Sequence, residues 1–457
     1  MTEQRIVRNQ ENLRRSVSLP QAIGVAFHQV VGAGVISLTG VAIALTGGGV
    51  SIAYLLAAIS IVIVSLPYAA IGSALPVTGG MYSYTSRFIH PAVGYFIMCI
   101  AVLGQTSLGL YGLAAGVYLH SLNPWFDQYY VAAFLITFFF LTNLKGAALS
   151  THIGLVLMAI MLVAFTMFFI LGLPHVNLVD YPPMMPNGAL KLLQAAATLT
   201  FATGGALIVV ELGGELRNPG RAIPISILGG TFLAVAIYVA IAFVAAGVLP
   251  IAEVANQPLS VVAKEFMPLR AWQFFILGGA MVSVIGTINA QMLTGSKSLL
   301  AAIDDGWFPK GMGAVSERFG TPHVLLIMLY LVGLTPVIFN IPIGMIASSV
   351  SAMGQLSYSL VIVAALRFRY AEPELHRQSR FRLGLGVQWA LTIVGVVICV
   401  LQALLLATQG VSHEMLWVLA VCVVLFLGWG VARYPTVLRI AKNVRQRGVN
   451  TSTAIIT

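Results

Sequence analysis

Charged side chains are scarce in this chain of 457 residues, of which 8% are Asp, Glu, Lys or Arg. A typical soluble domain carries about 25%. Acidic residues are the scarcest, and none stands between Glu11 and Asp127. Hydrophobic residues make up 59% of the chain, and the mean hydropathy is +0.94. This composition excludes an ordinary soluble protein, and recurring apolar runs of about 20 residues predict repeated membrane crossings.

Cysteine is also scarce, with three in the chain. Cys99, Cys399 and Cys422 lie within apolar runs and have neither metal-site nor disulfide spacing. We therefore expect these thiols to pack as small apolar groups, and we expect no metal and no cofactor. The first apolar segment is too long for a signal peptide and no small-residue cleavage site follows it, so we expect it to remain in the protein.

The apolar runs are long and uniform rather than short and alternating, which predicts an all-α polytopic membrane protein and not a β-barrel. Twelve spans are predicted: 19–45, 50–74, 92–120, 129–143, 150–173, 192–216, 223–249, 271–303, 322–339, 342–366, 384–408 and 413–433.

The formal net charge is +10 at pH 7, but its distribution argues against nucleic acid as a partner. All but three of the 24 basic residues fall in the two tails or in loops and helix ends on one side of the predicted membrane; the exceptions are Lys191, Lys264 and Arg270. The positive-inside rule then predicts a multi-pass protein of the plasma (inner) membrane with both termini cytoplasmic. An even number of spans agrees with that placement.

The segment from Val30 to Ser37 contains Gly32-Ala33-Gly34 and has three interpretations. A dinucleotide site needs a preceding strand, a third glycine or alanine, and an acid about 20 residues later. Ser37 holds the third position and no such acid follows, so we reject that reading. The two remaining interpretations are close helix packing by small residues and a break in a membrane helix that frees backbone groups for a solute.

A second interruption favours the break. Span 192–216 contains Thr200-Phe201-Ala202-Thr203-Gly204-Gly205 in the middle of an apolar run. Interruptions at corresponding places in two repeats are typical of a transporter's binding site. A half-helix N-terminus suits a carboxylate and freed carbonyls suit an ammonium, so the pair suits a zwitterionic amino acid.

The chain resembles the amino acid–polyamine–organocation family of secondary transporters over nearly its whole length. Four motifs carry the resemblance, and they occur in the family's order: Gly32-Ala33-Gly34-Val35-Ile36, Pro76–Tyr84, Glu215–Pro224, and Ser296–Lys310 followed by Gly320-Thr321-Pro322. In the first motif, the family usually has Ser at the position of Ala33.

The resemblance implies a LeuT-like five-plus-five inverted repeat with helices 1 and 6 broken, plus two C-terminal helices. The repeats are 19–173 and 192–366, the extra helices 384–433, and the cytoplasmic tails 1–18 and 434–457. It further implies alternating access, with the substrate carboxylate at the amides of Gly32, Ala33 and Gly34. The α-amino group would meet carbonyls near Val30, Phe201, Ala202 and Gly204. Phe201 aligns with an aromatic residue that closes over the substrate in relatives, although an ordinary packing role is the alternative.

Two positions depart from the family pattern. Leu207 stands where polyamine and some cationic amino acid carriers have an acid, which argues against polyamines. Met161 stands where several proton-coupled or exchanging relatives have a lysine that replaces a sodium ion or carries the proton. That mechanism of coupling is therefore in doubt for this chain.

Glu211 is the one acid well inside a predicted span, and an ionisable group there is a functional hypothesis by default. It is a candidate for the coupling proton's site; the alternative is a structural carboxylate paired with a basic loop residue. Gln105 is a candidate for reaching the pocket. Other polar groups near the breaks line the cavity or hydrogen-bond between helices: His28, Gln29, Ser107, Asn289 and Gln291.

We expect a secondary transporter of neutral L-amino acids, working by proton symport or amino acid exchange. The alternatives are a polyamine or cationic amino acid carrier, and an amino acid-sensing receptor of the same fold. An intramembrane enzyme is disfavoured because the chain has no His-Glu-x-x-His and no Gly-x-Ser-x-Gly motif, and paired breaks favour an occluded solute over a channel. The partners we expect are the substrate, the lipid bilayer and a coupling proton. The sequence does not indicate an oligomeric state.

Overall fold

The computed structural model describes residues 17–145, 151–314, 316, 321–408 and 413–446. Within these ranges the chain is helical, and its only β-type pairings are two isolated bridges, Val17 with Leu216 and Thr78 with Leu212. The predicted all-α class is therefore confirmed for the described part of the chain. Of the predicted tails, 1–18 and 434–457, residues 1–16 and 447–457 lie outside it, whereas residues 434–446 continue the last helix, His413–Gln446.

The first half of the chain forms these helices: α2 (Leu19–Val30), α3 (Ala33–Thr46), α4 (Val50–Ala74), α5 (Gly80–Phe88), α6 (Pro91–Leu103), α7 (Ser107–Leu122), α8 (Gln128–Leu144), α9 (Thr151–Gly172), α10 (Gly188–Thr203) and the 3₁₀-helices η4 (Gly205–Glu211) and η5 (Gly213–Glu215). Short 3₁₀ turns η1 (Gly47–Gly49), η2 (Gly104–Thr106) and η3 (Leu173–His175) join or end them.

The second half forms these helices: α11 (Pro219–Gly247), α12 (Ile251–Val254), α13 (Leu259–Phe266), α14 (Leu269–Phe274), the π-helix η6 (Phe275–Met281), α15 (Val282–Asp304), the 3₁₀-helix η7 (Lys310–Gly313), α16 (His323–Ile338), α17 (Ile343–Ala371), α18 (Pro373–Gln378), α19 (Leu385–Ala407) and α20 (His413–Gln446).

In the described residues, seven stretches are long and apolar enough to cross a membrane, or eight if one bent pair counts as a span. One of the seven, Leu19–Ala74, covers the first two predicted spans, and two shorter apolar helices, α8 and α16, match two more. The chain is therefore a multi-pass membrane protein. The count of twelve spans remains a prediction.

The first predicted helix break is present. α2 ends at Val30, and α3 begins at Ala33 after Gly32, whose φ of −97° and ψ of −146° are not helical. The amide of Gly32 turns back to the Val30 carbonyl, at 2.8 Å, instead of continuing the α-helical pattern. The helix therefore stops and restarts within three residues.

The second break is present as well. α10 ends at Thr203, and after Gly204 the chain continues as the 3₁₀-helix η4, bent by 40° from α10. A 3₁₀-helix of this length is uncommon because its hydrogen-bond geometry is poorer than that of an α-helix. Both predicted interruptions are therefore confirmed as changes of backbone structure.

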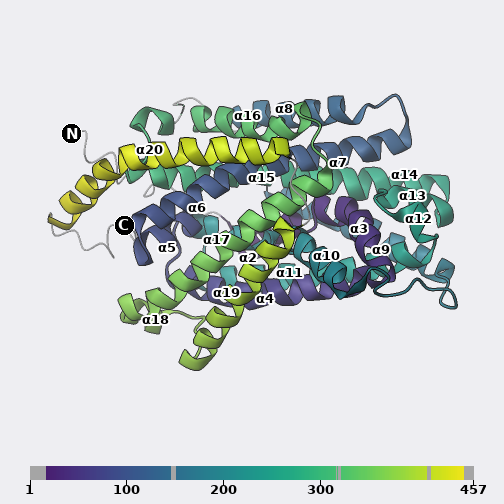
Figure 1. Ribbon diagram of the computed structural model, residues 1–457, viewed down its shortest axis with the longest axis horizontal. Coiled ribbons are helices and arrows are strands. Elements are labelled where there is room, and N and C mark those ends of the chain that lie inside the picture. The colour runs from purple at the N-terminus through teal and green to yellow at the C-terminus, as the bar shows by residue number, and fades with distance from the viewer. Residues whose placement is uncertain (1–16, 146–150, 315, 317–320, 409–412, 447–457) are drawn as a thin grey trace.

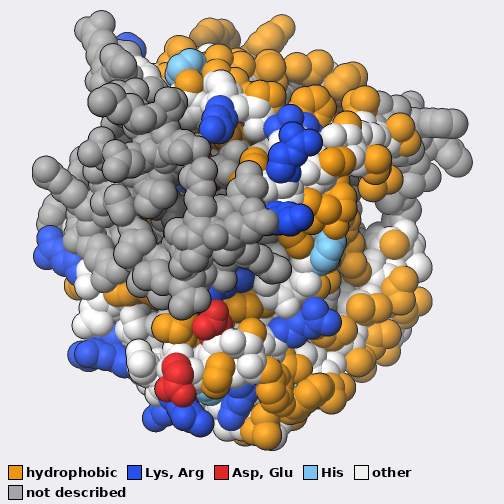
Figure 2. Space-filling view, turned by 90° about the vertical axis from the view of Figure 1, so that its left-hand side faces the viewer, with side chains coloured by type: hydrophobic (Ala, Val, Ile, Leu, Met, Phe, Trp, Pro, Cys, Tyr) orange, Lys and Arg blue, Asp and Glu red, His pale blue; other side chains and the backbone are white. Residues whose placement is uncertain are grey.

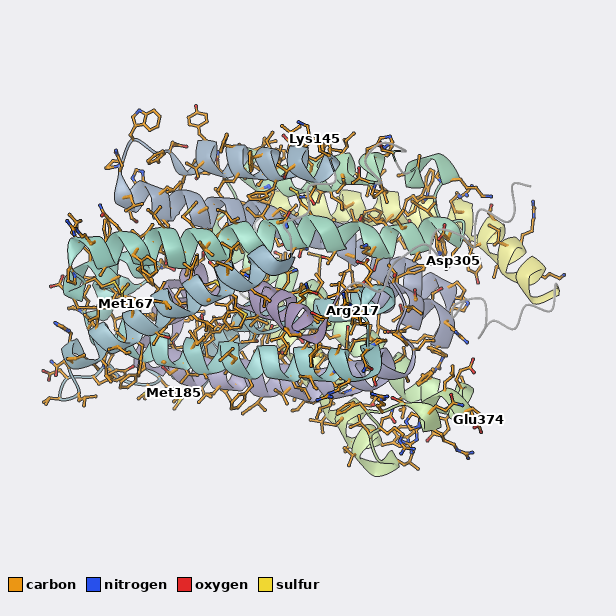
Figure 3. The ribbon with its side chains drawn as sticks, turned by 180° about the vertical axis from the view of Figure 1, so that it is seen from behind. Lys145, Met167, Met185, Arg217, Asp305 and Glu374 are labelled. Atoms are coloured by element: carbon orange, nitrogen blue, oxygen red, sulfur yellow. The ribbon has the colours of Figure 1, made fainter. Side chains whose placement is uncertain are left out.

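The helices form one bundle, and α2, α3 and α10 are labelled near its middle in the side view of Figure 1. α10 packs on α3, α4 and α17, while α2 packs on α11 and α9. Met167 and Met185 lie at one end of the bundle, and Asp305 and Glu374 lie at the other (Figure 3). Figure 2 looks onto this second end, where Lys and Arg side chains outnumber Asp and Glu and apolar side chains cover the flank.

Candidate substrate cavity

A cavity of about 190 Å³ lies beside the second break. Residues of α6, α7, α10, η4, α15 and α17 line it, together with Gln29 and Met81. At about 30 Å³ for each water molecule in the liquid, it has room for about six waters. Its wall is mostly apolar with a few polar groups, which is typical of a small-molecule site.

Among the residues of the first break whose side chains the structure describes, Gln29 is the one in the cavity wall. Val30, Gly32 and Gly34 are buried, but they are not part of the wall. The side chain of Ala33 lies outside the described side chains. The two breaks nevertheless touch, because a Cβ atom added to Gly205 would lie 2.0 Å from the Gln29 carbonyl oxygen. Glycine is therefore required where the second break contacts the end of α2.

Two carbonyl groups at the first break already have partners in this conformation. The Val30 oxygen accepts hydrogen bonds from the Gly32 amide and the Tyr238 hydroxyl. The His28 oxygen accepts one from the Thr287 hydroxyl at 3.1 Å. Because a carbonyl oxygen has two lone pairs, the Val30 carbonyl has no free lone pair for a substrate ammonium here.

The amide groups at the start of α3, in contrast, have no hydrogen-bond partner within their own helix. This holds for the first four amides of any helix, and Gly32, the N-cap residue of α3, has no side chain that could accept a hydrogen bond from them. The N-terminus of a helix carries partial positive charge and favours an anion. Of the groups that the sequence assigned to the substrate, these amides therefore keep the strongest physical case.

The second break contributes Phe201 and Gly204 directly to the wall. The ring of Phe201 lies 5.9 Å from that of Tyr111, centroid to centroid, so the two aromatic residues together cover one side of the cavity. The Gly204 carbonyl accepts the Leu207 amide at 3.2 Å. Ala202 is outside the wall and packs against Gly34, where an added Cβ would lie 2.6 Å from the Ala202 Cβ.

Gln105 lies in the wall, as the sequence suggested. Its side chain is 2% exposed, and its Oε1 atom has no hydrogen-bond partner within the described structure. Gly295 of α15 faces it, and a Cβ there would lie 2.7 Å from Gln105 Nε2. Gln105 therefore offers a buried acceptor to whatever occupies the cavity.

Glu211 is the single charged residue among the wall residues that the structure describes. Its Oε1 accepts the Met81 amide at 2.9 Å, and its Oε2 accepts the Ser298 hydroxyl at 2.8 Å. Met81 is in the first turn of α5, so the carboxylate also caps a helix N-terminus. The sequence suggested a basic loop residue as the partner of this carboxylate. The hydrogen bonds of the side chain go instead to an amide and a hydroxyl.

Three titratable side chains interact electrostatically with Glu211: Tyr68, Tyr84 and Lys297. The Lys297 ammonium itself pairs with Glu215 at 2.5 Å. Glu211 is 3% exposed, so a helix terminus, a hydroxyl and a nearby cation surround its carboxyl group in place of bulk water.

The two departures from the family pattern lie in different places. Leu207 is in the cavity wall, four residues before Glu211, and it leaves that position without charge. Met161 is fully buried in the apolar core and is not part of the wall.

No group of three or more His, Cys, Asp or Glu residues that could hold a metal occurs in the part of the chain that the structure describes.

Several polar residues singled out in the sequence join helices. Gln29 Nε2 donates to Gln291 Oε1 at 3.4 Å, and Asn143 Nδ2 donates to Asn289 Oδ1 at 3.1 Å. Both bonds tie α15 to another helix, as polar groups commonly do within membranes. Gln29 and Gln291 also line the cavity.

Sequence reasoning missed several wall residues, among them Met81, Tyr111, Ser298 and Tyr358. Met81 lies in one of the four quoted motifs, and Ser298 directly follows Ser296-Lys297 of another. Those motifs could have located both residues near a functional region. Tyr111 and Tyr358 lie in apolar helical runs and carry no such signal.

Comparison with known proteins places this architecture. Residues 17–429 match the amino acid permease family. The chain is 23% identical over 447 residues to the branched-chain amino acid permease BcaP of Bacillus subtilis (strain 168), covering 92% of this chain and 94% of that protein.

Other relatives are transporters as well. The methylthioribose transporter of the same organism is 24% identical, with 77% of this chain and 80% of that protein covered. The glutamate/serine transporter AimA of Bacillus subtilis (strain 168) is 23% identical, with 75% of this chain and 69% of that protein covered. The predicted transporter class is confirmed, and the intramembrane enzyme is excluded.

Proposed function

Because this chain belongs to the amino acid permease family, within the amino acid–polyamine–organocation transporters, we propose that its substrates are neutral L-amino acids. Transport would proceed by alternating access around the cavity between the two broken helices, in a five-plus-five inverted repeat of twelve spans. The observation that carries this proposal is the pairing of an uncapped α3 N-terminus with a small cavity whose wall holds one carboxylate.

The two ends of an amino acid meet different groups in this proposal. The substrate carboxylate binds the amides of Ala33 and Gly34, where the helix dipole favours an anion, and the Gly32 amide joins them once it leaves the Val30 carbonyl. The ammonium binds carbonyls of the second break, near Phe201, because the Val30 carbonyl is occupied in this conformation. Because Gln29 is the described side chain of the first break that lines the cavity, we propose that the two breaks separate slightly when the substrate reaches the α3 amides.

Neutral substrates are favoured by Leu207, which leaves an apolar surface where a cationic side chain would need an acid. Glu211 supports the alternative of a cationic amino acid, because it puts one carboxylate in the same wall. Its two hydrogen bonds and the end of α5 already stabilise that charge. A neutral side chain is therefore the better fit.

Proton symport and amino acid exchange both agree with this architecture, and Glu211 is the proposed proton site for symport. Replacement of Glu211 by Gln removes the titratable group while keeping its shape. If Glu211 carries the proton, uptake by Glu211→Gln loses its pH dependence, and unchanged dependence would reject this role. Both termini are proposed to be cytoplasmic, as the charge distribution predicts.

Counterflow in proteoliposomes tests the proposal. Vesicles preloaded with one unlabelled amino acid should accumulate the same labelled amino acid if the protein carries it. Alanine, serine, leucine, lysine and putrescine form a suitable panel, and we expect signals from the neutral members. Counterflow of lysine or putrescine alone would replace the neutral assignment with the cationic one. Ligand-dependent thermal stabilisation without counterflow would identify an amino acid sensor.

A further inference from the structure

One carboxylate closes one end of the cavity. Met81, Glu211 and Ser298 all line it, and we call these three residues the cavity floor. They belong to three separate elements, α5, η4 and α15, and the hydrogen bonds of the Glu211 side chain reach both of the other elements. Further contacts join these elements in pairs, since the Gly79 amide donates to the Glu211 carbonyl and the Tyr82 hydroxyl of α5 donates to Asp305 at the end of α15. Glu211 is therefore the side chain that binds both neighbours at the floor itself.

The floor faces the membrane side that carries the start of the described chain. Val17 donates its amide to the Glu215 carbonyl at 3.1 Å and accepts the Arg217 amide at 3.0 Å, just beyond the floor. The sequence predicts this side to be cytoplasmic. Lys297 and Glu215 form a 2.5 Å ion pair in the same layer, between α15 and η5. Two successive sets of contacts, those of Glu211 and those of Glu215, therefore lie on this side of the cavity.

The backbone around the floor is packed without spare room. Gly79 has a φ of +69°, which favours glycine, and its amide donates to the Glu211 carbonyl at 3.4 Å. A Cβ on Gly80 would lie 3.0 Å from the Val210 carbonyl oxygen. The segment before α5 is thus wedged between η4 and α15, and it cannot move away while Glu211 holds Met81.

We propose that Glu211 is a positioning residue of the transport cycle, whose carboxylate keeps the cavity floor closed until its bonds to Met81 and Ser298 break. This inference rests on the proposed transport of amino acids through the cavity. It adds a definite opening step, the separation of α5 and α15 from η4. Because Glu211 also faces the cavity, a proton or a donor group of the solute reaches the carboxylate from inside.

Thiol accessibility tests the floor directly. A reporter, Thr294→Cys, is placed in the cavity wall after Cys99, Cys399 and Cys422 are each replaced by Ser. A membrane-impermeant thiol reagent is then applied to inside-out and right-side-out membrane vesicles without substrate. We expect Glu211→Ala to raise the labelling rate from the predicted cytoplasmic side by about tenfold or more, the factor that one charge-assisted hydrogen bond contributes.

Two further variants separate positioning from folding. Glu211→Gln keeps an oxygen acceptor for the Met81 amide, and its NH₂ group can donate to the Ser298 oxygen, so we expect labelling within about twofold of the parent. Ser298→Ala removes one of the two bonds and should raise labelling severalfold. Glu374→Gln, at an exposed ion pair with Arg377 on α18, is the matched control and should change nothing.

The outcomes are distinct. Unchanged labelling in both Glu211→Ala and Ser298→Ala overturns the inference. If Glu211→Ala does not fold, Ser298→Ala decides alone, because it removes one hydroxyl and leaves the carboxylate bound to Met81. Transport kinetics add a second readout: faster opening should change the maximal rate more than KM. Counterflow by the parent protein is measured in parallel, so that its failure rejects the proposed function and not the closed floor.

Discussion

Replacement of Gly205 by Ala tests the contact between the two broken helices. An added Cβ would lie 2.0 Å from the Gln29 oxygen, 2.4 Å from its carbonyl carbon and 2.8 Å from the Val30 nitrogen. Ordinary contact of a Cβ begins at 3.4 Å, so the two backbones must separate by about 1.4 Å. All three atoms belong to the main chain, so a side-chain rotation cannot relieve the clash.

The expected cost follows from that geometry. Overpacking in a well-packed interior costs about 1–3 kcal/mol, occasionally more, and a clash with backbone belongs at the upper end. About 3 kcal/mol corresponds to a fall of about 6 °C or more in the Tm of a domain of 150–250 residues. A larger membrane protein should fall by less, so we expect about 3–6 °C. The same displacement moves Gln29 in the cavity wall, so counterflow should drop by about tenfold or more.

The matched control is Gly229→Ala on α11. Gly229 is exposed, and an added Cβ there would meet no atom within 4 Å. Alanine also has a higher helix propensity than glycine, so the Tm should stay the same or rise slightly, with full transport. A thermal-unfolding series in detergent, together with counterflow, measures both variants. A Gly205→Ala protein with the parent's Tm and transport rate would refute the proposed contact between the breaks.

Three further substitutions probe the cavity. Gly295→Ala pushes only the flexible end of Gln105, so we expect an unchanged Tm and a higher KM that grows with substrate size, measured across alanine, valine and leucine. Phe201→Ala removes an aromatic cover of the cavity and should weaken substrate binding about threefold to tenfold, as measured by ligand-dependent thermal shifts. Tyr238→Phe removes one of two hydrogen bonds to the Val30 carbonyl. It should lower the unfolding free energy by about 1 kcal/mol and leave substrate affinity equal or improved, whereas weaker affinity would show that this hydroxyl supports the site.

The class of protein and the positions of its two interruptions could be predicted from the sequence because both depend on local patterns. Runs of apolar residues set the helices, and the glycines at Gly32–Gly34 and Gly204–Gly205 mark where the runs are broken. Charge asymmetry gave an expected orientation by the same kind of counting. The apolar runs and the glycine breaks each lie within a window of about 20 residues, whereas the charge asymmetry is a count over the whole chain.

The wall of the cavity could not be predicted in that way, because its contacts join residues far apart in the chain. Glu211 meets Met81 and Ser298 across separations of 130 and 87 residues. The sequence showed an acid within a span, but not which donors would face it. Val30 was a reasonable ligand candidate at a helix end, and only the fold shows that Tyr238 and Gly32 occupy its oxygen.

The structure also joins two interpretations that the sequence presented as alternatives. Gly34 and Gly205 are close-packing glycines, since an added Cβ would strike Ala202 or Gln29. Close packing is what holds the uncapped start of α3 against the second break. A bulkier residue at Gly34 would push the start of α3 away from Ala202, and one at Gly205 would push the end of α2 away from the second break. The packing role and the proposed binding role therefore depend on the same missing side chains. In the proposed function, a substrate carboxylate that reaches the α3 amides loosens the contact between Gly34 and Ala202, which would couple substrate binding to movement of the two broken helices.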